Sequence, residues 1–458
     1  MQVISLFLHP SRAALDNHRH YAALHGYRHI VIDAADIYRN APAQWLFKYE
    51  SLLSEMHRAE EGEIVLLLCE NAAIVEPVPL DFVLGERDWL LTRIKDVRPQ
   101  PDVQIWRNTA RVRAELLKVV NRCRFGSPVP PIETDLLDAF DACTFPRVCG
   151  NARNPIYAVL AASGPLMPVW PRFRVFALAI AEEHADLSRT CVHPRLREAL
   201  IEHLNAHRNN HARAFEDGAS DESTMTAMST CNPGRPVSIT TVYTPEAAIY
   251  GRIAEANLRE YCERHGYTLY VHREVPRRIA ERLPMRGNWV KPFLLRENLP
   301  HHEWAFWLDA DTLVNDLDRP LESFCSSRDL VLARDVGTWI FNSGVMGFRR
   351  TPANAALLDR VIASVENVDD KQSLVSGGGD QWHFNCAVSE QASLGSEDIC
   401  SLVDINTPWG FRVPSSFLVH YHGMSPQMRA LLMSYDLRLR RAEMEHAGMA
   451  VGDSVGMK

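Results

Sequence analysis

Residues 306–315 read "FWLDADTLVN". A run of bulky apolar residues ends in two acids, Asp309 and Asp311, that are one residue apart. In open α/β sheets, ligands bind beyond the carboxyl ends of the strands. A buried strand that stops on two carboxylates therefore predicts a site at a sheet edge. The stretch "LLLCENAAIV" at 66–75 has the same shape, but Cys69 and Asn71 stand where the acids would be.

This likeness between two stretches belongs to a longer internal repeat. The segment "YAALHGY" (21–27) returns as "YCERHGY" (261–267), and 44 residues separate both His25 from Cys69 and His265 from Asp309. Further pairs follow in the same order: "RDWLLTR" (87–93) with "RDLVLAR" (328–334), "WRNT" (106–109) with "FRRT" (348–351), and "PRLREAL" (194–200) with "PQMRALL" (426–432). Chance does not readily give this shared order, so we predict two copies of one fold.

Each copy alternates strands and helices. In the second copy, a β-rich segment (237–244) precedes a periodic helical segment (246–266) that ends on Gly266, a stop signal. Such alternation predicts an α/β fold with a mostly parallel, doubly wound, Rossmann-like sheet. We predict four parts: a first domain (1–205), a polar linker (206–235), a second domain (236–440) and a C-terminal tail (441–458).

Composition excludes several classes of protein. The 458 residues are 46% hydrophobic and 23% charged, which is typical of soluble globular domains. A net charge of −8 argues against a nucleic-acid partner. The ten cysteines include no C-x-x-C pair, so neither a zinc site nor a disulfide framework is indicated. The N-terminus lacks a basic region before its short apolar run, and no stretch is apolar enough for a transmembrane segment. We therefore expect a cytoplasmic protein, either free or peripheral at a membrane.

The paired acids have a chemical interpretation. Two carboxylates so close together repel each other unless a cation lies between them. Mg²⁺ and Mn²⁺ prefer oxygen ligands and keep positions open for substrate phosphates. Asp309 and Asp311 are thus suited to hold such an ion against a diphosphate. The alternative is that one of them caps the helix or turn that follows.

The acids belong to an ordered series: "HGY", "NWVK", "WLDADTLV", "FNSGVM", "GGGDQWHFN" and "VHYHG". Over residues 237–425 this series resembles the GT-A glycosyltransferases that use nucleotide sugars. It is most similar to the retaining family of fungal α-galactosyl/mannosyltransferases and plant xyloglucan xylosyltransferases, and "FNSGVM" also resembles the glycogenin-like family. The resemblance implies two tandem GT-A-like domains with activity in the second. That activity would be metal-dependent transfer of a hexose or pentose from a UDP- or GDP-sugar to a carbohydrate or other hydroxyl acceptor, with retention.

The resemblance also assigns roles to individual residues. It places Asp311 and His420 on the metal, with His422 as a rival of His420, and Asp309 near both the metal and the sugar or ribose. Further expected contacts are Lys291 with a phosphate, Asp380 and Gln381 with the anomeric centre, and Asn342, Ser343 and Gly344 with donor-sugar hydroxyls. Tyr243 and Trp289 would stack on sugar or base, although core packing is the commoner fate of such aromatic residues.

Other interpretations remain open. Cys69 and Asn71 are poor ligands for Mg²⁺ or Mn²⁺, so the first copy is expected to be degenerate and non-catalytic. A catalytically silent protein that binds nucleotide sugars or carbohydrates is the main alternative for the whole chain. A nucleotidyltransferase, which would release pyrophosphate, is a weaker one.

Overall fold

The computed structural model describes residues 1–34, 41–74, 77–94, 98–125, 143–145, 176–178, 194–209, 226–281, 285–325, 328–337, 339–373, 379–390, 399–413, 415–424 and 426–455. The chain divides into two compact units, Met1–Asp217 and Gly218–Lys458. The catalytic part of the resemblance lies in the second unit, and each unit is described by itself.

Unit 1 is built on a six-stranded mixed sheet with the order β2-β1-β3-β6-β5-β7. Its strands are β1 (Gln2–Phe7), β2 (Arg28–Asp33), β3 (Ile64–Leu68), β4 (Ala72–Ile74), β5 (Trp89–Ile94), β6 (Arg98–Arg107), β7 (Cys143–Phe145) and β8 (Phe176–Leu178). Its helices are α1 (Arg12–His25), α2 (Ala41–Arg58), α3 (Leu80–Leu84), α4 (Ala110–Phe125) and α7 (Pro194–Ala206). Buried residues of α2 and α4 pack on one face of the sheet, and those of α1 and α3 pack on the other.

Unit 2 has a seven-stranded sheet with the order β16-β14-β15-β12-β10-β11-β9. Its strands are β9 (Met228–Cys231), β10 (Val237–Val242), β11 (Thr268–His272), β12 (Trp304–Leu308), β13 (Thr312–Val314), β14 (Leu330–Arg334), β15 (Phe341–Arg349), β16 (Ile399–Cys400), β17 (Thr407–Pro408) and β18 (Leu418–His420). Its α-helices are α8 (Ala248–His265), α9 (Arg277–Ala280), α10 (Lys291–Asn298), α11 (Pro352–Glu366), α12 (Gly379–Ser389), α13 (Leu402–Ile405) and α14 (Pro426–Val455). Short 3-10 helices are η3 (Pro245–Ala247), η4 (Gly287–Val290), η5 (Leu299–His301), η6 (Leu321–Phe324) and η9 (Trp409–Phe411).

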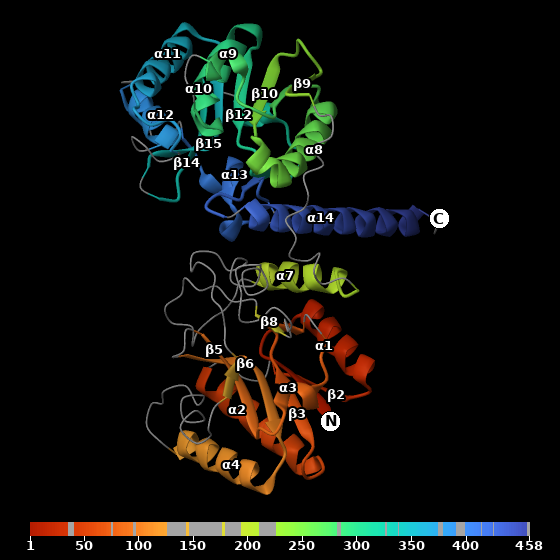
Figure 1. Ribbon diagram of the computed structural model, residues 1–458. Coiled ribbons are helices and arrows are strands. Elements are labelled where there is room, and N and C mark those ends of the chain that lie inside the picture. The colour runs from red at the N-terminus through yellow and green to blue at the C-terminus, as the bar shows by residue number, and fades with distance from the viewer. Residues whose placement is uncertain are drawn as a thin grey trace. The chain divides into compact units, whose positions relative to one another are not determined.

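The core of unit 2 lies on both faces of this sheet. Figure 1 shows α10, α11 and α12 along one side and α8 along the other. Apolar residues of α10, α11 and α12 pack with those of β12, β14 and β15 in one buried cluster. The predicted helix over 246–266 is confirmed: α8 ends at His265, and Gly266 adopts the left-handed φ of 69° that favours glycine.

The sheets differ from the expectation of mostly parallel strands. In unit 2, β10 pairs in parallel with β11 and β12, but β15 is antiparallel to both β12 and β14. The reason is the short connection from Arg334 to Phe341, because neighbouring parallel strands need a crossover of a dozen residues or more. The antiparallel direction brings the start of β15 to the carboxyl end of β12.

The expected domain boundaries also differ from the structure in two places. The segment 206–235 was expected to be a linker, but it contributes β9, which pairs antiparallel with β11 at the edge of the unit-2 sheet. The expected tail after residue 440 continues α14, which begins at Pro426 and runs to Val455. Polar composition concealed β9 because an edge strand does not need two apolar faces.

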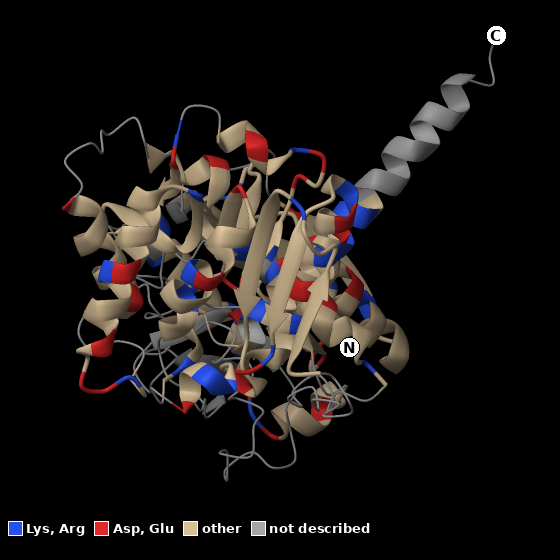
Figure 2. Cartoon of the chain, turned by 90° about the horizontal axis from the view of Figure 1, so that it is seen from above, with Lys and Arg blue, Asp and Glu red and all other residues tan. Residues whose placement is uncertain are grey.

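Charges are mixed rather than gathered. Figure 2 shows basic and acidic positions interspersed over the helices and strands, and Glu and Asp outnumber Lys and Arg by 57 to 49 in the sequence. This pattern agrees with the exclusion of a nucleic-acid groove. In the described part of the chain, no helix is both long and apolar enough to cross a membrane.

Candidate functional site

A pocket of about 910 Å³ opens where β10 and β12 end and β15 begins. Every residue that the sequence assigned to the site lines this pocket, with the exception of Trp289. The residues come from positions between 243 and 420, and the mixed sheet brings them together at one edge.

Asp309 and Asp311 lie in the turn between β12 and β13, not within the strand itself. Backbone bonds tie this turn down: Asp309 N–H donates to the carbonyl of Gly344 at 2.8 Å, and Thr312 N–H donates to the carbonyl of Asp309 at 3.2 Å. The expectation that strand alternation aims both acids to one side is therefore replaced. The turn, not the pleat, directs the two carboxylates to the same place.

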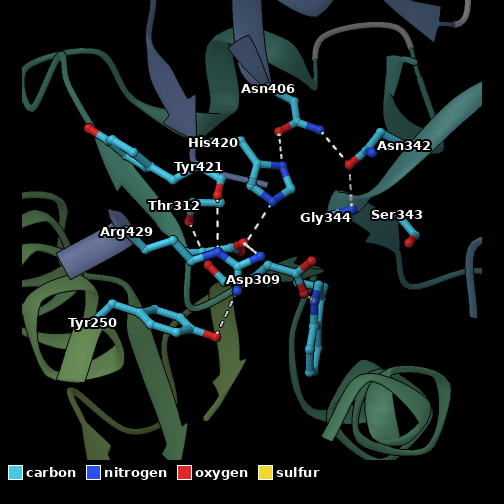
Figure 3. Close-up of polar contacts among 12 residues, drawn as sticks. Tyr250, Asp309, Thr312, Asn342, Ser343, Gly344, Asn406, His420, Tyr421 and Arg429 are labelled. Atoms are coloured by element: carbon cyan, nitrogen blue, oxygen red, sulfur yellow. Dashed lines mark hydrogen bonds and ion pairs between the residues drawn. The ribbon is translucent and has the colours of Figure 1, made fainter. Parts of the chain in front are cut away.

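His420 joins these acids through a small second sheet with the order β13-β18-β17. There, Thr312 pairs with His420 across two antiparallel strands, and Tyr421 N–H donates to the carbonyl of Asp311 at 2.9 Å. As a result, His420 Nε2 lies 3.1 Å from Asp311 Oδ1, as Figure 3 shows. Atoms of Asp309, Asp311 and His420 lie within 4.8 Å of one another. His422 lines the pocket but is not part of this group.

Two residues that the sequence analysis missed complete this side of the pocket. Arg429 on α14 forms an ion pair with Asp311 Oδ2 at 3.1 Å and donates to the hydroxyl of Tyr250 at 3.1 Å. Burial alone would raise the pKa of Asp311, but His420 and Arg429 outweigh it and hold that pKa below its usual value. The repeat carried a signal for Arg429, because "PQMRALL" matches "PRLREAL" at the arginine.

Lys291 links the two groups of acids. Its Nζ lies 2.9 Å from Asp309 Oδ1 and 2.9 Å from Asp380 Oδ2, and the side chain is buried. Burial alone would lower the pKa of Lys291, but the two carboxylates reverse this and raise it. Lys291 is thus a fixed ammonium. In this structure it contacts carboxylates at the pocket wall, where a phosphate contact was expected.

The loop at the start of β15 is held by the first turn of α12. Gln381 Oε1 accepts from the backbone N–H of Ser343 and from Asn342 Nδ2, both at 3.1 Å. Ser343 Oγ donates to Asp380 Oδ2 at 2.9 Å. These bonds use the oxygen of Gln381, so its amide nitrogen is the end that is able to meet a ligand. Asn342, Ser343, Asp380 and Gln381 therefore form one connected wall.

Gly344 has a steric role that its expected contact with sugar did not anticipate. A Cβ atom at this position would lie 2.2 Å from Cε1 of His420 and 2.8 Å from Oδ1 of Asn342. Only glycine lets the imidazole approach the strand so closely. The residue therefore makes room for His420.

The two predicted aromatic contacts have different outcomes. Tyr243 lines the pocket, and its hydroxyl donates to Glu255 at 2.7 Å. Trp289 has 0% exposure, belongs to the main apolar cluster, and donates its Nε1–H to the carbonyl of Ser373 at 3.1 Å. The predicted stacking of Trp289 on substrate is wrong because the indole has no surface to offer. The alternative of core packing holds.

The corresponding turn of unit 1 lacks this chemistry. Cys69 is buried, which raises the pKa of its thiol to about 12. Glu70 points to the end of β1, where it accepts from the Leu8 N–H at 3.1 Å, and Asn71 donates to Asp102 at 3.3 Å. His184 and the segment 149–158, which the sequence analysis compared with the second copy, lie outside the described residues.

Asp309, Asp311 and His420 fit a divalent cation. Their donors are carboxylate oxygens and an imidazole nitrogen, a set that Mn²⁺ and Mg²⁺ accept. Asp311 is ionised, because its pKa is depressed, and its charge is met by Arg429. Asp309 is already engaged by Lys291 and by the Nε1–H of Trp307 at 2.7 Å, so Asp311 is the more available of the two carboxylates.

Comparison with known proteins agrees with this geometry. Residues 237–338 match the profile of the galactosyl transferase GMA12/MNN10 family. An uncharacterised alpha-1,2-galactosyltransferase of Schizosaccharomyces pombe is 31% identical over 90 residues, which are 19% of this chain and 25% of the yeast protein. The chain thus spans about a quarter of the length of that relative.

Solved structures with detectable likeness are also glycosyltransferases. One involved in glycosylation of the major capsid of PBCV-1 is 20% identical and covers 43% of this chain and 98% of its own, with a TM-score of 0.34. The galactosyltransferase LgtC, in complex with donor and acceptor sugar analogues, is 12% identical over 43% of this chain and 95% of its own, with a TM-score of 0.27. Mouse xyloside xylosyltransferase 1 is 13% identical over 42% and 99%, with a TM-score of 0.25.

Proposed function

We propose that this chain, whose residues 237–338 belong to a glycosyltransferase family domain, transfers a hexose or pentose from a nucleotide-diphosphate sugar to a hydroxyl acceptor. The observation that carries the proposal is the convergence of Asp309, Asp311 and His420 on one pocket from segments more than 100 residues apart in the sequence. Catalysis would depend on Mn²⁺ or Mg²⁺, which these three residues would hold. When bound, such an ion supplies positive charge to the leaving diphosphate.

The chain adds its own cations to the same pocket. The Arg429 guanidinium lines the pocket beside Asp311, and Lys291 lines it beside Asp309. Arginine suits phosphate recognition because its planar fork donates two parallel hydrogen bonds. We assign Arg429 to the diphosphate, since its one ion pair with Asp311 can be shared with an incoming anion. Lys291 holds Asp309 and Asp380 in place.

Asp380 and Gln381 are the proposed residues of the reaction centre. Asp380 lies in the first turn of α12, where the helix dipole favours a negative charge, and three side chains donate to or pair with it: Asn288, Ser343 and Lys291. This carboxylate can stabilise positive charge that develops at an anomeric carbon. The amide nitrogen of Gln381 can hydrogen-bond the donor or the leaving oxygen.

We propose galactose as the first donor sugar to test and retention as the outcome. The support is the yeast relative, which is named an alpha-1,2-galactosyltransferase. Galactose is α-linked in its common nucleotide sugar, so an α-linked product keeps the configuration. The pocket itself carries no feature that selects one sugar.

A carbohydrate acceptor is favoured by exposed aromatic residues next to the proposed reaction centre. Trp382 directly follows Gln381 and is 39% exposed, and Trp339, three residues before Asn342, is 37% exposed. Aromatic faces exposed to solvent are suited to stack on the apolar face of a sugar ring. We propose that the acceptor lies over this side of the pocket.

We also propose that unit 1 is a second, non-catalytic copy of the domain. The support is a set of matching contacts. Asn17 and Ile74 exchange two hydrogen bonds, as Asn257 and Val314 do.

The aromatic cluster beside that contact also matches. In unit 1, the His25 and Tyr27 rings stack at 5.2 Å. In unit 2, His265 and Tyr267 stack at 5.4 Å. The strand order β2-β1-β3-β6-β5-β7 has the same directions of pairing as β11-β10-β12-β15-β14-β16.

The test is release of nucleoside diphosphate from a panel of UDP- and GDP-sugars with Mn²⁺, with and without simple sugar acceptors. We expect Asp311→Asn to lower turnover by about 100-fold or more, because an amide is a poor ligand and several kcal/mol of charge stabilisation would be lost. Asp359→Asn, an acid exposed on α11, is the matched control.

Circular dichroism of both variants separates lost chemistry from lost folding. The proposal is wrong if Asp311→Asn keeps full activity. Binding of donors without turnover would favour the silent binding protein, and pyrophosphate as product would favour a nucleotidyltransferase.

A further inference from the structure

His420 is one end of a chain of side-chain amides that runs behind the pocket wall (Figure 3). The other end is a backbone group: Gly344 N–H donates to Asn342 Oδ1 at 2.9 Å. Because a backbone N–H is only a donor, the atom it meets must be the oxygen of the Asn342 amide. The orientation of Asn342 is thereby set.

That orientation determines the next amide. Asn342 Oδ1 also accepts from Asn406 at 2.9 Å, so the Asn406 atom that faces it is the NH₂ group. The oxygen of Asn406 then faces His420 Nδ1, 2.9 Å away. Asn406 itself is buried, at 3% exposure, in the connection between α13 and β17. It does not line the pocket.

An amide oxygen only accepts, so His420 Nδ1 must carry a hydrogen. The neutral ring then has its lone pair on Nε2, which is the nitrogen that faces Asp311 Oδ1 at 3.1 Å. The hydrogen bond at one ring nitrogen of a histidine decides which nitrogen is free to bind a metal. The opposite tautomer would leave the Asn406 oxygen facing a second acceptor in a buried place.

We infer that Asn406 is a positioning residue that holds His420 with its Nε2 lone pair directed to the metal site beside Asp311. This inference rests on the proposed metal-dependent function, and it adds a residue for which the sequence offered no signal. Partners of this kind orient a ligating imidazole, and their loss typically costs about 10- to 100-fold in metal affinity.

The test uses Mn²⁺ titration calorimetry on the full chain without a sugar donor. Asn406→Ala removes the acceptor and should weaken Mn²⁺ binding by about 10- to 100-fold. Asn406→Asp keeps an oxygen that accepts from Nδ1, so it should bind Mn²⁺ far more tightly than the alanine variant. Asn354→Ala is the control. Asn354 is equally buried, at 2% exposure, and donates to the carbonyls of Asp329 and Arg349 away from the pocket.

Asn354→Ala should lose stability yet keep the wild-type affinity for Mn²⁺. Equal Mn²⁺ affinity of Asn406→Ala and wild type would overturn the inference, as would an equal loss in Asn354→Ala.

A second readout needs no ion. Nitrogen-15 spectra of histidine-labelled, metal-free protein at pH 8, assigned with a His420→Gln variant, should show a protonated Nδ1 in His420 that changes in Asn406→Ala. A bare Nδ1 in the wild type overturns the inference whether or not Mn²⁺ binds. Failure of the wild type to bind Mn²⁺, with Nδ1 protonated, overturns the proposed metal dependence instead.

Discussion

At the scale of single residues, the site depends on close approaches that small side chains permit. Gly344 has no Cβ, and for that reason the imidazole of His420 can lie against β15. The same residue supplies the backbone N–H that orients Asn342 and the carbonyl that accepts from Asp309 N–H. One glycine thus serves both sides of the proposed metal site.

Gly344→Ala should therefore displace His420 and weaken Mn²⁺ binding by about 10-fold or more, since a ligand would be misplaced. The added Cβ would lie 2.2 Å from His420 Cε1, far inside van der Waals contact. The measurement is calorimetric titration with Mn²⁺. Gly410→Ala is the control, because a Cβ there meets nothing within 4 Å. Unchanged affinity in Gly344→Ala would mean that the ring moves without loss of the site.

At the scale of elements, α14 is held to the site by a buried polar cluster. Asp436 accepts from Trp409 Nε1 at 3.1 Å and from the hydroxyl of Tyr421 at 2.6 Å, and it pairs with Arg412 at 2.7 Å. Tyr421 directly follows His420, and Arg429 lies on the same helix as Asp436. The cluster therefore sets the position of α14 relative to β18, and with it the position of Arg429.

Strand β11 carries a buried histidine that should make unit 2 sensitive to acid. His272 is 3% exposed, and burial lowers its pKa from 6.5 to about 4, with Arg278 acting in the same direction and Glu297 against it. The folded state thus favours the neutral ring, whereas the unfolded chain binds a proton near pH 6.5. Stability is complete above pH 6.5 and is lost as the pH falls from 6.5 to about 4.

At pH 5 this loss is on the order of 2 kcal/mol. Denaturant unfolding at pH 7.5 and pH 5, in a chelating buffer, should show a smaller pH dependence for His272→Gln than for wild type. His301→Gln, at an exposed position, should behave as wild type does. An unchanged pH dependence in His272→Gln would assign the acid sensitivity to other groups.

At the scale of the whole molecule, the two units differ in what their matching turns offer. Among the described residues, Asp309, Asp311 and His420 are the one group of histidine, cysteine and acidic side chains arranged for a metal ion. In unit 1, the turn after β3 has a protonated thiol and an amide, and Asn71 is engaged by Asp102. The scaffold contacts match where the ligands do not.

The full chain should therefore bind a single Mn²⁺ ion, and Asp311→Asn should remove that binding. Calorimetric titration of the wild-type chain gives the stoichiometry directly, with the variant titrated under the same conditions. Two equivalent ions per chain would contradict the prediction. So would one ion that persists in Asp311→Asn, because the site would then lie elsewhere.

Some of these features follow from the sequence alone because their signals are local. Apolar runs that end in turn residues predicted β12, and a helical period that ends on Gly266 predicted α8. The D-x-D turn, Lys291 and the order of short motifs predicted the pocket at the ends of the strands. Such patterns need only a few neighbouring residues, since strand period, helix period and the φ of glycine are properties of short segments.

Other features were decided only by the tertiary structure. Asp311 meets His420 through the pairing of β13 with β18, and no short segment encodes that register. The antiparallel direction of β15, the burial of Trp289 and the link from Asn406 to His420 also depend on which distant segments become neighbours. A side chain's role is set by its contacts, and these contacts exist only after residues more than 100 positions apart in the sequence have been packed together.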